Sequence, residues 1–420
     1  MNSISSDLKI MGKLFLGFLK WCIIALLVGG IVGVIGSLFH IGIEKATEIR
    51  TDYDWIILFL PLAGLFIVFI YKVMGMADDK GTNSILLAVR TDEKLTAKTA
   101  FLIFVTSIIT HLFGGSAGRE GAALQIGGSI ASKLGRIIKL DEFDATIITM
   151  CGMSAGFGAL FGTPVASAVF AMEVISVGIM HYSAIVPCVI SSITGAAVAS
   201  LFGIAPTSFS ISLFPEMSVL SIIQVVGLSV LCAVISVIFC FLMRKSNGLF
   251  KKFLPNTYLR AFLGGLAIVL LTLIIGTRDY NGAGMSVIEN AFTGDSRPEA
   301  FILKIVFTVI TLSAGYKGGE IVPVFFIGAA FGNVASHFLG LPPSFGAGIG
   351  MLSMFCGVTN CPLASIFLSV ELFGAKGIVF YAVAASVSYI LSGYEGLYSE
   401  QKILYSKLKP RFIDKIIGKN

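Results

Sequence analysis

Charged residues are scarce in this chain. Asp, Glu, Lys and Arg make up 13% of its 420 residues, whereas a soluble domain has about 25%. A helix needs roughly 20 apolar residues to cross a bilayer, and barrel strands would instead show short alternating segments of about ten residues. The composition therefore excludes a soluble domain and predicts an all-α polytopic membrane protein. The runs without charge are 99–118, 145–172, 174–214, 217–243 and 321–370.

Histidines and paired cysteines are also few. The four histidines are scattered, and none of the seven cysteines belongs to a CxxC pair. Small buried hydrophobic residues are the simplest interpretation of these cysteines. The HExxH and Ser/His patterns that a catalytic membrane site would need are absent. We therefore expect no enzyme, no metal site and no cofactor.

Positive charge is concentrated in two segments. Residues 244–260 contain five basic residues and no acid, and residues 401–420 contain six basic residues and one Asp. Because basic segments stay on the cytoplasmic side, we expect a multi-pass protein of the cell membrane, in contact with lipid, with both termini in the cytoplasm. The apolar run 21–40 is too long for a cleaved signal. This membrane context excludes a nucleic-acid partner.

Two motif pairs repeat along the chain. "GTPVASAVFAMEV" (162–174) and "NCPLASIFLSVEL" (360–372) share Pro, Ala, Ser and Glu at a constant offset of 198, and two glycine-rich turns carry Glu120 and Glu320, 200 residues apart. Weak internal repetition in an apolar chain is typical of transporters built from structural repeats. We expect repeats at about 20–205 and 218–400, with the basic segment 244–260 as a linker between the halves. Structural roles are the simplest interpretation of Glu173 and Glu371.

The glycine-rich turns predict an anion site. Helix N-termini expose unpaired N–H groups and carry about half a positive charge, and glycines such as Gly118 and Gly121 let the backbone approach an ion closely. In the second turn, Ile321 and Val322 precede a proline that suits the first turn of a helix. A carboxylate at this depth by default marks an ion or proton path. Glu120 would fill the pocket when ionised and leave it when protonated.

Simpler interpretations stay open for both carboxylates. Glu120 would act as a helix cap paired with Arg119, which we expect mainly to tie down the loop. Glu320 would cap the helix that begins at Ile321, with Lys317 as its partner. Lys317 would otherwise lie at the membrane face.

Four motifs resemble one known family. "GREGAALQIGG" (118–128) resembles the GREGP-x-x-Q-x-G-G signature of the CLC superfamily of chloride channels and anion/proton antiporters. "GGEIVP" (318–323) resembles the second glycine turn of this family, and "LFGTPVASAVFAMEV" (160–174) resembles one of its helices. "GLYSEQKIL" (396–404) resembles the family's final helix, which places the anion-coordinating tyrosine at Tyr398. The resemblance implies two inverted repeats with discontinuous helices, one integral membrane domain over 1–420, and a homodimer with one pore per subunit. It makes Glu120 the gating glutamate, and it implies no cytoplasmic regulatory domain.

Three departures narrow the resemblance. The chloride-type serine loop is replaced by "KGTNSIL" (80–86), where Gly81, Thr82 and Asn83 are the expected equivalents. Val174 stands where the chloride antiporters have their inner proton glutamate, and Glu320 stands where they have isoleucine. These features resemble the fluoride/proton antiporter branch, so we expect fluoride and protons as the transported ions and Glu320 as a proton carrier. Gly118, Arg119, Gly121, Ile321, Val322 and Tyr398 complete the expected anion site. A chloride channel or chloride/proton antiporter of the same fold is the alternative.

Overall fold

The computed structural model describes residues 2–77, 79–91 and 95–417. These ranges contain sixteen α-helices, and seven of the described helices are long and apolar enough to cross a membrane. The predicted all-α polytopic architecture is confirmed. The first eight helices are α1 (Asn2–Asp52), α2 (Leu60–Val73), α3 (Thr82–Arg90), α4 (Ala97–Leu112), α5 (Glu120–Ile137), α6 (Glu142–Phe161), α7 (Pro164–Glu173) and α8 (Ile185–Leu201).

In the second eight helices, the first is again the longest and the third is again the shortest. They are α9 (Val219–Phe253), α10 (Thr257–Ile275), α11 (Met285–Thr293), α12 (Ala300–Ala314), α13 (Ile321–Leu339), α14 (Pro343–Thr359), α15 (Pro362–Phe373) and α16 (Ile378–Leu391). Thus α3 and α11 each have nine residues, and α5 and α13 have 18 and 19. Three 3-10 turns lie at Asp54–Phe59, Tyr182–Ala184 and Ala375–Gly377.

The prediction that residues 244–260 form a linker between the halves is wrong. These residues form the end of the 35-residue α9 and the start of α10. The non-helical segment between α8 and α9, residues 202–218, instead separates the two runs of eight helices. Basic residues indicate a side of the membrane, and they do not interrupt a helix.

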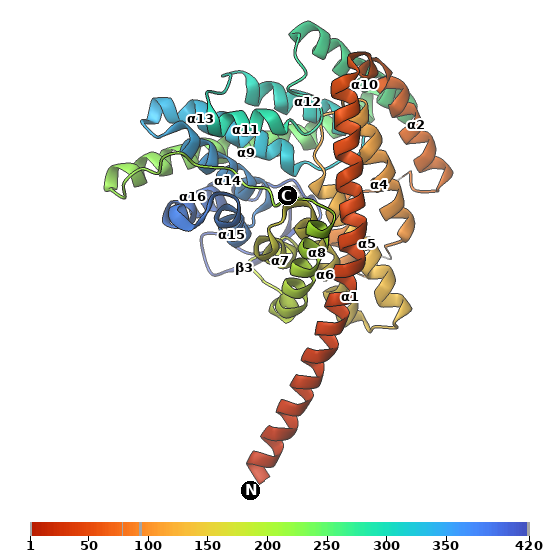
Figure 1. The fold of residues 1–420 in the computed structure, drawn as a ribbon, viewed down its shortest axis with the longest axis vertical. Coiled ribbons are helices and arrows are strands. Elements are labelled where there is room, and N and C mark those ends of the chain that lie inside the picture. The colour runs from red at the N-terminus through yellow and green to blue at the C-terminus, as the bar shows by residue number, and fades with distance from the viewer. Residues whose placement is uncertain (1, 78, 92–94, 418–420) are drawn as a thin grey trace.

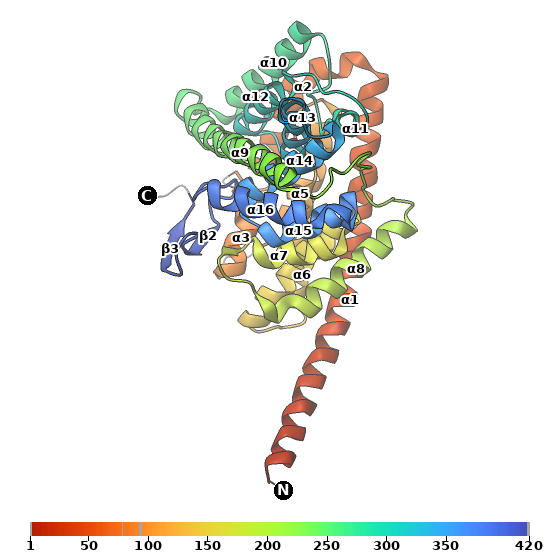
Figure 2. The same cartoon turned by 90° about the vertical axis from the view of Figure 1, so that its left-hand side faces the viewer.

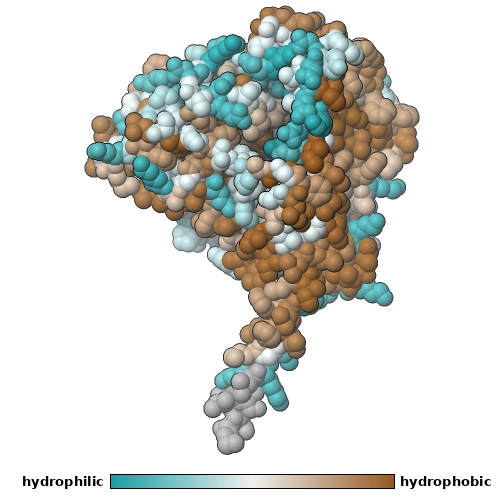
Figure 3. Space-filling view, viewed as in Figure 1, coloured by the Kyte–Doolittle hydropathy of each residue, from teal (hydrophilic) through white to brown (hydrophobic). Residues whose placement is uncertain are grey.

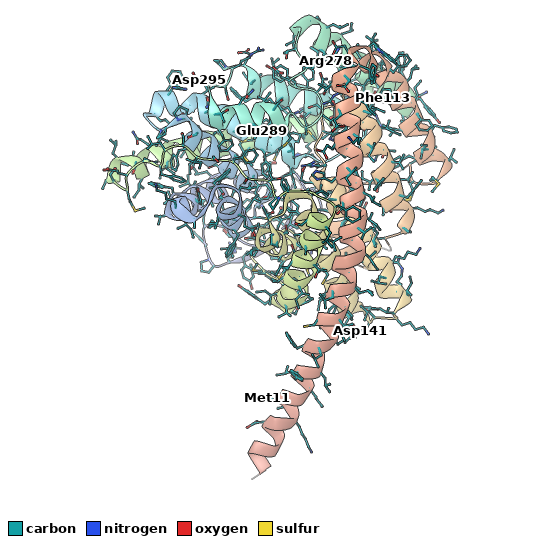
Figure 4. The ribbon with its side chains drawn as sticks, in the orientation of Figure 1. Met11, Phe113, Asp141, Arg278, Glu289 and Asp295 are labelled. Carbon is teal, nitrogen blue, oxygen red and sulfur yellow. The ribbon has the colours of Figure 1, made fainter. Side chains whose placement is uncertain are left out.

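Local sequence signals fix several helix ends. The carboxylate of Asp141 accepts a hydrogen bond from the backbone N–H of Asp144 at 2.8 Å and caps α6 (Figure 4). Helix α6 stops at Gly162, whose φ of 66° favours glycine. Pro164 and Pro362 open α7 and α15, where a missing N–H costs nothing. Figure 2 shows α7 and α15 lying side by side.

Glycines bring the central helices close together in both halves. A Cβ atom at Gly127 of α5 would lie 2.0 Å from the carbonyl oxygen of Gly152 of α6. The equivalent contact in the second half joins Gly328 of α13 to Gly350 of α14, at 2.5 Å. Small residues at such crossings allow backbones to pack tightly in a membrane. Most residues of the central helices α5, α6, α13 and α14 are consequently buried.

Apolar side chains cover the periphery. Helix α1 runs along one side of the molecule (Figure 1), and Figure 3 shows a hydrophobic face over the middle of this helix, with hydrophilic residues gathered toward the top of the view. Leu14 and Ile23 on α1 are each 68% exposed. Such a surface suits lipid, because large exposed apolar patches are unfavourable in water.

The chain ends in a small sheet that the sequence does not predict. Strand β1 (Ser176–Val177) pairs in parallel with β2 (Lys402–Tyr405), which pairs antiparallel with β3 (Phe412–Ile416). The last described helix ends at Leu391, so Tyr398 lies on a loop. The expectation of a final helix headed by Tyr398 is therefore wrong.

Candidate functional site

The two glycine turns meet through their backbones. The N–H of Gly118 donates to the carbonyl of Gly319 at 2.6 Å, and the N–H of Gly319 donates to the carbonyl of Gly118 at 2.7 Å. A Cβ atom at Gly319 would lie 2.5 Å from the backbone nitrogen of Gly121. Only glycine permits this approach, and the reciprocal pair brings the N-termini of α5 and α13 to one point. The predicted convergence of the two turns is observed.

Glu120 is the first residue of α5 and is completely buried. Its Oε2 accepts a hydrogen bond from the backbone N–H of Arg119 at 3.0 Å, and the backbone N–H of Val322, on α13, acts on the carboxylate electrostatically. The Nε of Arg119 lies 3.5 Å from its Oε1. The carboxylate therefore occupies the space between the two helix N-termini. A Cβ atom at Gly118 would lie 2.8 Å from Oε2, so this glycine provides part of that space.

Gly121 is the point where three site residues meet. A Cβ atom there would lie 3.1 Å from the hydroxyl oxygen of Thr82 and 3.4 Å from a carboxylate oxygen of Glu320. Thr82 opens α3, after Gly81 with a φ of 64°. Glu320 directly precedes α13. The structure therefore brings Thr82 and both glutamates to one buried centre.

Gln125 belongs to the same centre, although our sequence analysis did not select it. Its Nε2 donates to the hydroxyl of Thr82 at 3.2 Å and to the carbonyl of Gly121 at 3.3 Å. It lies one helical turn after Gly121, inside the GREGAALQIGG motif. Residues four apart share a helix face, and this spacing is the signal that identifies it.

Tyr398 reaches the centre from the C-terminal loop. Its side chain is buried, and Glu320 and Glu120 are the carboxylates that act on it electrostatically. The loop is held by a hydrogen bond from Leu397 N–H to the carbonyl of Val358 at 2.9 Å. It is also held by Gln401, whose side-chain amide donates to two carbonyls at the ends of α7 and α14.

Several polar atoms in this centre lack a partner. Buried polar groups nearly always form hydrogen bonds, so a concentration of unpaired ones indicates the place of a ligand. Within the described part of the chain, the buried polar atoms at this centre without a hydrogen-bond partner are Glu120 Oε1, Gln125 Oε1, Glu320 Oε2 and the Tyr398 hydroxyl. A ligand that accepts hydrogen bonds suits the Tyr398 hydroxyl and a protonated carboxyl group, whereas the Gln125 Oε1 needs a donor.

Two expected neighbours of the centre are engaged elsewhere. The Oδ1 of Asn83 accepts a hydrogen bond from the backbone N–H of Glu400 at 3.0 Å, so this side chain ties α3 to the C-terminal loop. Lys317 pairs with Asp79, with its Nζ 3.4 Å from Oδ2. The alternative in which Lys317 is the ionic partner of Glu320 is therefore wrong.

Glu173 and Glu371 are reciprocal helix caps. The carboxylate of Glu173 accepts from the backbone N–H groups of Leu363 and Ala364, at 3.1 and 2.8 Å. That of Glu371 accepts from Val165 and Ala166, at 3.0 and 2.8 Å. Each carboxylate lies at the N-terminus of the facing helix, where the helix dipole favours negative charge. The structural interpretation of both residues is confirmed.

These features define a class of protein: a polytopic membrane protein in which helix N-termini meet at a buried pair of carboxyl groups, as at the central sites of secondary transporters. The family model described as voltage gated chloride channel matches residues 63–393, and this chain belongs to that family, the CLC channels and antiporters.

Known relatives cover most of the chain. The chloride/fluoride channel protein of Pseudomonas syringae pv. tomato is 34% identical over 395 residues, which are 92% of this chain and 87% of that protein. The crystal structure of a CLC-type fluoride/proton antiporter matches with a TM-score of 0.88 and 30% identity, covering 91% of this chain and 97% of the other. The H(+)/Cl(-) exchange transporter ClcA of Vibrio cholerae is 24% identical, covering 92% and 89%.

Proposed function

We propose that this protein is a fluoride/proton antiporter that exports fluoride across the cell membrane. The observation that carries the proposal is the centre where Glu120 and Glu320 lie at two helix N-termini, within electrostatic reach of the buried, unpaired hydroxyl of Tyr398. The names of two of these relatives, which include fluoride, support the choice of anion.

Fluoride suits this centre chemically. Backbone N–H groups at Gly121, Ile321 and Val322 belong to the two helix starts, and such helix starts bind anions. The N–H of Gly118 is already paired with Gly319, so this glycine contributes space near the anion site. Fluoride is small and a strong hydrogen-bond acceptor, and a protonated carboxyl group donates a short, charge-assisted bond to it. Two carboxyl groups in one centre hold a proton beside the anion. Chloride makes weaker use of such donors.

Glu120 acts as the gate and proton carrier in this proposal. Its carboxylate lies between the helix N-termini, where it receives a hydrogen bond from the backbone N–H of Arg119 and the electrostatic attraction of the backbone N–H of Val322. An anion takes that place only when protonation weakens these interactions and the side chain leaves. Glu320 then passes protons between the pathway and the cytoplasm, because Val174 supplies no carboxyl group at the end of α7.

The test is transport by purified protein in liposomes. We expect fluoride efflux to exceed chloride efflux and a fluoride gradient to drive proton uptake. The variant Glu120→Gln keeps the shape of the side chain without its titration, so proton uptake should vanish whether fluoride passage persists or stalls. Intact proton uptake in this variant would remove Glu120 from the gate. Chloride efflux above fluoride efflux would assign the protein to the chloride-transporting alternative.

Assembly and orientation are parts of the same proposal. We infer a homodimer with one pore per subunit, and both termini in the cytoplasm. Arg244, at the basic end of α9, forms an ion pair with Glu395 in the C-terminal loop, which supports placing the two basic segments on one side of the membrane. Cross-linking in liposomes tests the dimer. Labelling of single cysteines at residues 245 and 409 by an impermeant reagent tests whether the two basic segments lie on the same side of the membrane. We expect the two positions to be labelled equally.

A further inference from the structure

A partly buried ion pair joins the segments that precede Thr82 and Glu320. The Nζ of Lys317 lies 3.4 Å from Oδ2 of Asp79, although the residues are 238 positions apart. The side chain of Asp79 is 2% exposed and that of Lys317 is 20% exposed. The Lys317 ammonium group also lies 4.1 Å from the centre of the Tyr71 ring. Ser84, at the start of α3, donates to the other carboxylate oxygen of Asp79 at 3.5 Å.

The two residues of the pair lie at the same sequence distance from the site residues that follow them. Asp79 stands three residues before Thr82, and Lys317 stands three residues before Glu320. Two glycines separate Lys317 from Glu320, and Gly81 with its φ of 64° immediately precedes Thr82. Glycine is the most conformationally permissive residue. The segments between the ion pair and the site residues therefore need an anchor at their outer ends.

We propose that the Asp79–Lys317 pair is a positioning clasp that sets the spacing between the Thr82 hydroxyl and the Glu320 carboxylate. These two groups meet at Gly121, at 3.1 and 3.4 Å from the place of its Cβ atom. Small displacements of such positioned groups are costly, since a shift of about 1 Å can reduce a rate about 100-fold. The clasp thereby controls anion selectivity and proton coupling without contacting the ion. This inference rests on the proposed function.

The test combines three variants of the clasp. Asp79→Asn and Lys317→Met each leave one buried charge without its partner, whereas the double variant leaves none. The fluoride-to-chloride flux ratio and the number of protons moved per fluoride are measured in liposomes for each. We expect the ratio to fall about tenfold or more in each single variant, following the sensitivity to position given above. The double variant should lose no more than the more severe single variant, because both remove one interaction.

Two further variants complete the design. Lys80→Met breaks the neighbouring Lys80–Glu400 pair, which has the same 3.4 Å separation but an exposed lysine, and should leave ratio and coupling unchanged. Lys317→Arg retains the charge and should retain most of the coupling.

The clasp would be overturned if the folded double variant kept the wild-type fluoride-to-chloride flux ratio and the wild-type proton coupling. It would also be overturned if the loss in the double variant equalled the sum of the losses in the two single variants. The double variant keeps this outcome accessible if a single variant fails to fold. Failure of the wild-type protein to exchange fluoride for protons would instead refute the proposed function, so the two failures are distinguishable.

Discussion

Removing one oxygen atom from Tyr398 should weaken fluoride binding while the protein stays stable. The hydroxyl of Tyr398 is buried and has no hydrogen-bond partner among the described residues. Tyr398→Phe therefore breaks no bond within the protein. Burial of an unpaired hydroxyl costs about 1–3 kcal/mol, so the variant should be at least as stable as the wild type in the absence of anion.

The cost appears only when the anion is bound. A hydrogen bond to a charged group contributes about 1.5–3 kcal/mol, and 1.4 kcal/mol corresponds to about a tenfold change in affinity. The dissociation constant for fluoride should consequently rise about 10- to 100-fold in Tyr398→Phe. Isothermal titration of purified protein with fluoride measures this change, and the thermal unfolding midpoint without fluoride measures stability. Tyr398→Ala should alter occupancy or coupling as well.

Tyr381 provides a matched control. It is also completely buried, and its hydroxyl likewise finds no partner in the ranges that the structure describes. It lies on α16 against Phe373, with the ring centres 6.1 Å apart. Tyr381→Phe should leave fluoride affinity unchanged. Equal affinities of wild type and Tyr398→Phe would refute the role of Tyr398 as a donor to the anion.

The glycine turns were predictable because their chemistry is local. Only glycine allows the backbones at Gly118 and Gly319 to pair, and a membrane chain has few other reasons to place Glu120 and Glu320 in such turns. Motifs 200 residues apart in sequence therefore indicated two halves that meet. Prolines open α7 and α15 as well, and they are local signals of a helix start that the sequence contains.

Contacts between distant segments could not be predicted in the same way. The loop with Tyr398 is shaped by its docking on Val358 and by the amide of Gln401, and the residues around Tyr398 carry no pattern that distinguishes this loop from a helix. The pairing of Lys317 with Asp79 joins residues 238 positions apart. Either charge alone is compatible with several partners, and only the fold selects one.

Charge patterns predict a side of the membrane without giving helix boundaries. The basic residues of 244–260 fall within α9 and α10 because lysine and arginine are good helix formers. Asn83 shows a related limit. It follows Thr82 directly, but successive helical residues point in different directions, and its side chain contacts Glu400 instead of the carboxyl pair.

The remaining predictions concern the carboxylates and the inner loop. Glu320→Gln and Glu320→Ala should abolish fluoride/proton exchange while the protein stays folded; a capping role would instead lower the unfolding midpoint and preserve transport per folded molecule. Thr82→Ser should lower the fluoride-to-chloride flux ratio by about tenfold, the scale of one methyl group in a tight pocket, and an unchanged ratio would place selectivity elsewhere. Glu173→Gln and Glu371→Gln should destabilise the protein by similar amounts, because each carboxylate accepts two N–H groups from the facing helix at nearly identical distances. A neutral amide offers only one oxygen and no charge, so each variant should lose about 1–3 kcal/mol, seen as a lower thermal midpoint with transport per folded molecule preserved. The equality of the two losses is the decisive measurement, since helix capping is reciprocal between the halves and proton transfer is not. Lost proton coupling in Glu173→Gln with an unchanged midpoint, and no such loss in Glu371→Gln, would make Glu173 a proton carrier despite its position as a cap.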